Sequence, residues 1–398
     1  MASIPGLARR LRTFQVLSGS DAQEVAFYEG RAHLSQANLV VVGAKPVNRG
    51  QTAGILADAV KVLMADALLK VDVAVAWGEG AAWALSFAQA GSRVFVLPSG
   101  RTAEELSESE LAVLGANGAF AQTMGARSLA AVGAAYANVI VVPSPFASEL
   151  LEKDRALVSR ASDEACVPIR FGADDPPNDP SSDSVQTASF SAKSIAGKVD
   201  CRRALTKRYS LTVGPRTLVL GVAPLRSGKG GEEVFRALAM LAALDVVVVV
   251  PADGDSDLTE RVRRLSVQSP GRLVVMEPGD GQHRVLRGAA DAFLCADPDD
   301  RTGRAAALAQ RYGALPIVLD SGASHDFLVD YDSASHTGTA ILIGGLEPWQ
   351  IEGAVRRATA LKNGVDVFPE ICQRLMETAP VWSRTASLFD EIAAQYTT

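Results

Sequence analysis

A glycine-rich run that contains a lysine, "RSGKGGEE" at 226–233, has the residue types of a phosphate-binding turn. It follows the apolar run 218–222 and opens a helical stretch, so backbone N–H groups at the helix N-terminus could bind phosphate oxygens while Lys229 adds a charge. The run is not a P-loop, because no Ser or Thr follows Gly-Lys. A solvated turn is the alternative, and the run by itself favours that alternative.

Three aspartates, Asp297, Asp299 and Asp300, follow the apolar run 292–295. Carboxylates at the carboxyl end of a parallel strand can bind the hydroxyl groups of a ligand or a metal ion. An acidic loop of this kind also caps helices, and a helix is expected to begin near Arg304. The sequence leaves both interpretations open.

The histidines do not form a pattern that indicates catalysis. They lie far apart in the chain, without a GxSxG elbow or an HExxH pair, so neither a Ser-His-Asp triad nor a zinc site is expected. We therefore assign no metal site and no cofactor. The four residues are His33, His283, His325 and His336.

Composition indicates a globular protein of more than one domain. The chain has 398 residues, 48% hydrophobic and 21% charged, which suffices for large cores. The net charge of -6 comes from interspersed residues, so sugars or proteins, not nucleic acid, are the expected partners. No run approaches the roughly 18 apolar residues of a membrane span, and no signal peptide is expected. Four cysteines without a CxxC pair indicate reduced thiols and a cytoplasmic location.

Short β-branched runs alternate with helical stretches along the whole chain, which predicts an α/β protein with parallel sheets. The expected strands are 39–42, 71–75, 93–97 and 139–142 in the first half and 218–222, 246–250, 273–276, 292–295 and 316–319 in the second. A Pro-, Ser- and Asp-rich segment at 173–194 separates the halves. We place the domains at 1–180 and 181–380, and expect a final helix within 381–398 to pack back on the first domain.

The second half resembles the bacterial glycogen and starch synthases. The segment "FSAKSIAGKVDCRRALTKRYSL" at 190–211 is similar to the family's interdomain signature of Tyr-Ser-Ala, Gly-Lys and Lys-x-x-Leu. The strings "ADAFLCAD", "QRYGALPIV", "VDYD" and "GTAIL" follow in family order, and Trp382 stands where the family has Phe-Ser-Trp. In the first half, "VDVAVAWGEGAAW" and "VPSPFASEL" are similar to family motifs. The resemblance covers residues from about 70 to the end.

This resemblance implies the GT-B fold, with two Rossmann-like domains whose parallel sheets face each other across a cleft. It also implies a retaining glucosyltransferase that adds glucose from ADP-glucose to an α-1,4-glucan. The positions it assigns to the sugar nucleotide are Lys229, Gly230, Asp300, Gly303, Ser321 and Gly322.

Several of the family's functional residues are replaced in this chain. Pro224 stands where the family has an arginine for the donor diphosphate, which leaves Lys229 as the one aligned cation. Asp300 stands for the family's glutamate, and Ser321-Gly322-Ala323 keeps one of two glycines.

The first domain has lost the polar residues that the resemblance leads us to expect there. Val75 and Trp77 align with two histidines of the family motif Val-His-Ala-His-Asp-Trp, and Gly78 aligns with its aspartate. The nearest counterpart of the family's N-terminal Lys-x-Gly-Gly-Leu loop is 51–55, which lacks the lysine and the paired glycines.

Transfer of a glycosyl group depends on preorganised charges, and the loss of one such group commonly costs about 10²- to 10³-fold in rate. We therefore assign no catalytic residue, and the leading hypothesis is a degenerate glycogen-synthase-like protein that acts as a binding or assembly component. It would bind an ADP-sugar or an α-glucan weakly, or associate with a protein partner or with itself. One alternative is an active glycosyltransferase that uses Lys229 and Asp300. Another is a sensor of sugar nucleotides.

Overall fold

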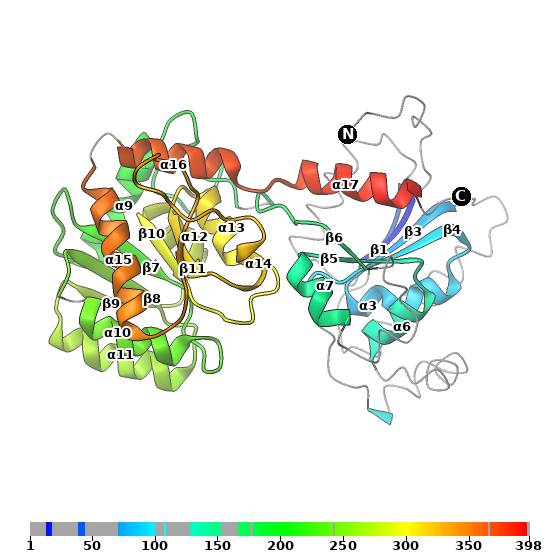
Figure 1. Cartoon of the computed structure of the whole chain (residues 1–398), viewed down its shortest axis with the longest axis horizontal. Coiled ribbons are helices and arrows are strands. Elements are labelled where there is room, and N and C mark those ends of the chain that lie inside the picture. Colours follow the sequence, from blue (N-terminus) through cyan, green and yellow to red (C-terminus); the bar gives the residue numbers. More distant parts are fainter. Residues whose placement is uncertain are drawn as a thin grey trace. The chain divides into compact units, whose positions relative to one another are not determined.

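The computed structural model describes residues 13–17, 39–43, 71–99, 107–108, 128–152, 166–175, 178–241, 243–364 and 367–395. The chain forms two compact units (Figure 1). The first comprises Met1–Asp175 together with Val381–Thr398, and the second comprises Pro176–Pro380. The change from one unit to the next falls within the Pro-, Ser- and Asp-rich segment 173–194.

The first unit contains a parallel sheet with the strand order β2-β1-β3-β4-β5-β6. Its described strands are β1 (Thr13–Leu17), β2 (Leu39–Gly43), β3 (Val71–Trp77), β4 (Ala90–Val96), β5 (Val139–Val142) and β6 (Cys166–Pro168). Its described helices are α3 (Glu79–Ala82), η1 (Trp83–Phe87), α6 (Leu129–Tyr136), α7 (Pro145–Glu152) and α17 (Trp382–Gln395). All four expected strands are present, whereas β1 and β6 were not predicted.

Strand β3 shows how both faces of this sheet are covered. Val73, Val75 and Trp77 point to one face, where they pack with residues of α17. Ala74 and Ala76 point to the other face, toward α3, η1 and α6. Because both faces are buried, apolar residues stand at consecutive positions along the strand.

Helix α17 is bound to the first unit by polar contacts at its N-terminus. The backbone N–H of Trp382 donates to the Asp174 carboxylate at 2.7 Å, and the Thr385 hydroxyl donates to the Arg170 carbonyl at 2.8 Å. A Cβ on Gly172 would lie 2.3 Å from the Trp382 backbone nitrogen, so only glycine allows this approach. The last helix, expected to begin near residue 383, thus packs on the first unit.

The second unit contains a parallel sheet with the strand order β12-β11-β10-β7-β8-β9. Its described strands are β7 (Leu218–Val222), β8 (Val246–Pro251), β9 (Leu273–Met276), β10 (Ala292–Cys295), β11 (Leu315–Leu319) and β12 (Ile341–Ile343). Its described helices are α9 (Ala196–Arg208), α10 (Gly231–Leu241), α11 (Ser256–Gln268), α12 (Gln282–Ala289), α13 (Arg304–Arg311), α14 (Gly322–His325), α15 (Pro348–Lys362) and α16 (Val367–Thr378).

Helices cover both faces of the second sheet (Figure 1). One core joins α10, α11 and α15 to one face, and a second core joins α9, α12 and α13 to the other. The α/β class, with two parallel sheets, is confirmed. Among the described residues, no helix combines the length and the apolar character that crossing a bilayer requires.

The polar segment after the first unit is tied firmly to the second. The side chain of Asp183 is fully buried, and its carboxylate accepts a hydrogen bond from the Tyr312 hydroxyl at 2.8 Å and pairs with Arg284. Burial, followed by this hydrogen bond, raises the pKa of Tyr312. Asp183 and both partners belong to the second unit, so these contacts do not cross the boundary between the units.

A buried lysine holds two helix C-termini together. The Lys198 ammonium donates to the carbonyls of Arg287 and Gly288, each at 3.2 Å, and of Tyr312 at 2.8 Å. These carbonyls end α12 and α13, so the lysine satisfies groups that have no partner within their own helices. Burial is the main cause that lowers the pKa of Lys198 to about 8.

The lowered pKa predicts a pH-dependent stability. Because the unfolded chain keeps this lysine protonated to a higher pH than the folded chain does, the free energy of unfolding should rise from about pH 8 toward pH 10. Substitution Lys198→Met removes the titrating group, so the stability advantage of the wild type should grow by about 2 kcal/mol over this window. Urea unfolding at several pH values measures it. Lys207→Met, at an exposed position of α9, is the control and should show no such trend; an advantage that stays constant with pH contradicts the prediction.

Candidate functional site

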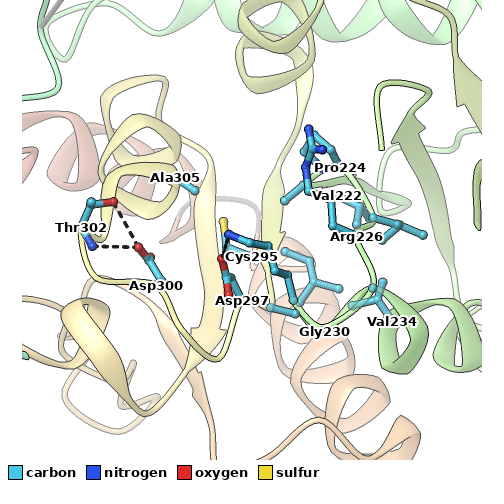
Figure 2. A pocket seen from close by; sticks show the side chains of 16 residues that line it. Val222, Pro224, Arg226, Gly230, Val234, Cys295, Asp297, Asp300, Thr302 and Ala305 are labelled. Atoms are coloured by element: carbon cyan, nitrogen blue, oxygen red, sulfur yellow. Dashed lines mark hydrogen bonds and ion pairs between the residues drawn. The ribbon is translucent and has the colours of Figure 1, made fainter. Parts of the chain in front are cut away.

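A pocket of about 200 Å³ lies in the second unit, at the carboxyl ends of β7 and β10 and the N-terminus of α10 (Figure 2). This edge of an open parallel sheet is where ligands usually bind. Three of the six positions assigned from sequence line it, namely Lys229, Gly230 and Asp300. The charged residues of its lining are Arg226, Lys229, Asp297 and Asp300.

The turn between β7 and α10 contains two glycines in the left-handed region, Gly228 at φ 73° and Gly230 at φ 76°. A Cβ on Gly230 would lie 1.9 Å from the carbonyl oxygen of Ala296, in the loop after β10. Glycine is therefore required so that the two loops can touch. Gly230 shapes the wall of the pocket by this contact.

The N-terminus of α10 is a weaker anion site than the glycine-rich run suggests. The backbone N–H groups of Lys229 and Gly231 both donate to the Arg226 carbonyl at 3.1 Å, within the turn. Glu232 and Glu233 occupy the first turn of the helix, where their charges compensate the positive end of the helix dipole. Only part of the expected attraction for phosphate therefore remains.

Lys229 reaches across the pocket to the opposite loop. Its ammonium lies 3.1 Å from a carboxylate oxygen of Asp297, and both side chains are partly exposed, at 42% and 30% (Figure 2). The other Asp297 oxygen accepts the backbone N–H of Asp299 at 3.0 Å, so this carboxylate is held in place. Asp299 does not line the pocket and pairs with Arg301 at 3.1 Å.

Arg226 is a second cation at the pocket, and the sequence analysis missed it. By aligned position, Lys229 is the one cation expected at this site, because Pro224 stands where the family has an arginine. The structure corrects this, since Arg226 lies two residues further along the same loop and lines the same pocket. Its guanidinium donates to the carbonyl of Asp253 at 3.1 Å. A cation in the same loop was the signal that could have revealed it.

The loop that carries Arg226 is anchored to the loop after β8. The Asp255 carboxylate accepts the backbone N–H of Ser227 at 2.7 Å, which is the largest cause of the lowered pKa of Asp255. Beside it, the Asp253 carboxylate lies 2.8 Å from His283 Nε2. Within the described residues, no three His, Cys, Asp or Glu side chains are grouped to hold a metal ion.

Asp300 stabilises the turn that precedes α13. One of its carboxylate oxygens accepts the backbone N–H groups of Thr302 at 3.0 Å and Gly303 at 2.9 Å, and also the Thr302 hydroxyl at 3.1 Å (Figure 2). These bonds fix the start of α13, which begins at Arg304. The N-cap of α13 is Gly303, without a side-chain cap, and the Arg304 backbone N–H donates to the Thr302 hydroxyl at 3.2 Å, so the aspartates do not cap the helix directly. The second oxygen has a long contact of 3.5 Å with Ser324.

The remaining assigned positions border the pocket without lining it. Gly303 has φ 63°, and a Cβ there would meet the ring of Phe327 at 2.6 Å. Ser321 and Gly322 begin the short helix α14 after β11. The backbone N–H of Ala323 donates to the Asp300 carbonyl at 2.9 Å, which ties this turn to the pocket loop.

Cys295 places a thiol in the wall of the pocket (Figure 2). Burial raises its pKa to about 12. The thiol is therefore protonated at neutral pH and unsuited to act as a nucleophile.

The carboxyl end of β3 in the first unit is filled by aromatic rings. Trp77, only 1% exposed, lies with its ring centre 5.3 Å from that of Phe171 and 6.0 Å from that of Trp382. Val75 is fully buried in the same core. Val75 has no polar side-chain group, and the Trp77 indole is packed within this core. The loop at 51–55, and His33, lie outside the described residues.

Curated relatives identify the group of proteins that the chain resembles. It is 27% identical over 265 residues to a glycogen synthase of Methylocella silvestris, covering 64% of this chain and 55% of that protein. It is 30% identical over 270 residues to a glycogen synthase of Anaeromyxobacter dehalogenans, covering 65% and 56%. The chain thus spans about half the length of the curated relatives it matches. No family model matches the sequence.

Solved structures agree with these relatives in fold. The catalytic domain of starch synthase IV from Arabidopsis thaliana, bound to ADP and acarbose, superimposes with a TM-score of 0.75 at 17% identity, over 88% of this chain and 78% of that one. The chain is a glycogen/starch synthase-like GT-B protein. Anabaena HepE in complex with UDP and glucose gives a TM-score of 0.62 at 13% identity, over 97% of this glycogen synthase-like chain and 100% of HepE.

The role of Asp300 as an acceptor that caps the turn before α13 can be tested by two substitutions. Asp300→Ala removes an acceptor of three hydrogen bonds, so the free energy of unfolding should fall by about 1–2 kcal/mol. Asp300→Asn keeps an acceptor oxygen and should cost much less. Chemical denaturation measures both. Equal losses in the two variants would show that the negative charge, and not the cap, is what matters.

Proposed function

We propose that this chain binds a nucleoside diphosphate sugar at the pocket of the second unit and does not transfer the glucosyl group. Binding is supported by the two cations, Arg226 and Lys229, that line one pocket at the sheet edge. Two solved structures of similar fold hold ADP or UDP, which fits this ligand class.

The loss of transfer is supported by the environment of the polar groups. One carboxylate oxygen of Asp300 accepts backbone N–H groups of its own turn. This carboxylate is therefore poorly placed to stabilise positive charge that develops on a sugar. At the end of β3, Trp77 packs in an aromatic core with Phe171 and Trp382, at a position where the resemblance to the family leads us to expect a histidine. The single observation that carries the proposal is this replacement of polar lining by packed aromatic rings.

The proposed role is a binding or assembly component for an α-glucan or a protein partner, including a second copy of the chain. Cys201, Cys295 and Cys372 are buried free thiols, which fits the reducing cytoplasm. A second candidate is an active glycosyltransferase, and Arg226 favours it because this residue supplies the cation that the replacement at Pro224 removed.

An assay of transfer separates the two candidates. Incubation of the protein with radiolabelled ADP-glucose or UDP-glucose and glycogen should give no incorporation above background, because transition-state stabilisation by charged groups is lost. Incorporation that Lys229→Ala or Arg226→Ala abolishes would establish the active enzyme instead. Incorporation that neither substitution changes would point to a contaminating enzyme and calls for repurification.

Calorimetric titration of ADP tests the proposed binding. Lys229→Ala and Arg226→Ala should each weaken affinity about fivefold, since partly exposed cations contribute about 1 kcal/mol each. The control is Arg236→Ala, on α10 but paired with Glu233 at the surface, and it should leave affinity unchanged. Equal affinity in wild type, Lys229→Ala and Arg226→Ala would place the nucleotide elsewhere.

A further inference from the structure

We propose that Asp297 is a specificity-determining residue that occupies Lys229 as an internal counter-ion and weakens the pocket's affinity for diphosphates. The inference rests on the proposed nucleotide binding and adds a control on it. Its starting point is the ion pair of 3.1 Å that joins the loop after β10 to the turn before α10.

The carboxylate is held where it competes with a phosphate. Its second oxygen accepts the Asp299 backbone N–H at 3.0 Å, so the Asp297 side chain is oriented toward Lys229 by its own loop. Figure 2 shows this carboxylate on the pocket side of the loop, below Cys295. A phosphate that binds Lys229 must therefore displace a carboxylate that is already in position, or share the ammonium with it.

The charged side chains that line the pocket are balanced in sign, so the pairing of Asp297 with Lys229 affects anion binding. Arg226 and Lys229 contribute two positive charges, and Asp297 and Asp300 contribute two negative charges. Asp300 is engaged by the backbone N–H groups of its own turn, which stabilise its charge locally. Asp297 instead neutralises the cation at the pocket. A multiply charged anion is consequently attracted less strongly by these four side chains than by the two cations alone.

The size of the effect follows from Coulomb's law. Two like charges about 5 Å apart in a partly exposed site repel by roughly 1–2 kcal/mol, which corresponds to about tenfold in affinity. Ligands with fewer negative charges experience less repulsion. Asp297 thus shifts the preference of the pocket from diphosphates toward less highly charged ligands.

Salt dependence gives a second consequence. An ion pair within the protein and a bound anion compete for one ammonium, so the net charge that attracts the ligand is small and salt should change affinity little. Without the carboxylate, the exposed cations act on the ligand directly. The affinity should then fall more steeply as salt rises.

The test compares four proteins by calorimetric titration of ADP in EDTA at two salt concentrations: wild type, Asp297→Asn, Lys229→Ala and the double variant. Asp297→Asn keeps the size of the side chain and removes its charge, so it should bind ADP about tenfold more tightly, with a steeper salt dependence. In the Lys229→Ala background the same substitution should give a smaller gain, because it removes only the repulsion between the carboxylate and the ligand and frees no ammonium. Thermal unfolding shows that each variant is folded.

Asp299→Asn is the matched control. It removes one negative charge two residues away, from a side chain that pairs with Arg301 outside the pocket lining. Its effect on ADP affinity should stay below about twofold, because the charge is screened and does not touch Lys229. An equal gain from both substitutions would overturn the proposal, since it would show a general effect of net charge.

The outcomes separate this inference from the proposed function. Measurable ADP binding by the wild type that Asp297→Asn leaves unchanged or weakens overturns the role of Asp297 and leaves nucleotide binding intact. Binding by Asp297→Asn alone supports the inference strongly. Binding by neither protein overturns both, because a freed Lys229 beside Arg226 is then no diphosphate site.

Discussion

Strand β7 pairs with β10 in the middle of the second sheet, and this pairing places the turn before α10 against the loop that follows β10. The contact is so close that position 230 has room for hydrogen alone, beside the Ala296 carbonyl. Every feature of the pocket depends on it. It sets Lys229 within reach of Asp297, and it puts Arg226 on the same wall.

The same pocket combines a scaffold suited to phosphate with charges that oppose it. Parallel strands, a glycine-rich turn and a helix N-terminus are the usual parts of an anion site. In this chain two backbone N–H groups of the turn donate to a carbonyl of the same turn. Acidic residues occupy the first helical turn, and a carboxylate pairs with the lysine. The backbone geometry of an anion site is kept, whereas the positive charge that would attract a phosphate is largely cancelled.

Sequence patterns predicted the sheets well because strands buried on both faces must be apolar at consecutive positions, as in 246–250. The same logic missed the short strands β6 and β12 and the alternating strand β1. The burial of Asp183 was not predicted, because composition does not reveal a buried partner such as Tyr312, which lies far along the chain.

The candidate site was predictable in its place and only partly in its chemistry. The run around Lys229 and the loop around Asp300 were found from residue types after strands. Whether Asp300 binds a ligand or its own turn depends on the path of two backbone N–H groups, which sequence does not specify. Arg226 was not predicted, because a cation that stands two residues further along the loop is recognised only when the side chains are placed in space.

The route of the chain has a mechanical consequence. The backbone leaves the first unit after Asp175 and re-enters it at Val381, so two covalent chain connections join the units. Cleavage of either connection alone leaves the other intact, and α17 remains docked by Trp382 and Thr385. A nick at one crossing would therefore yield a two-fragment molecule whose pieces stay together under native conditions, as complementing fragments do, rather than two separate domains.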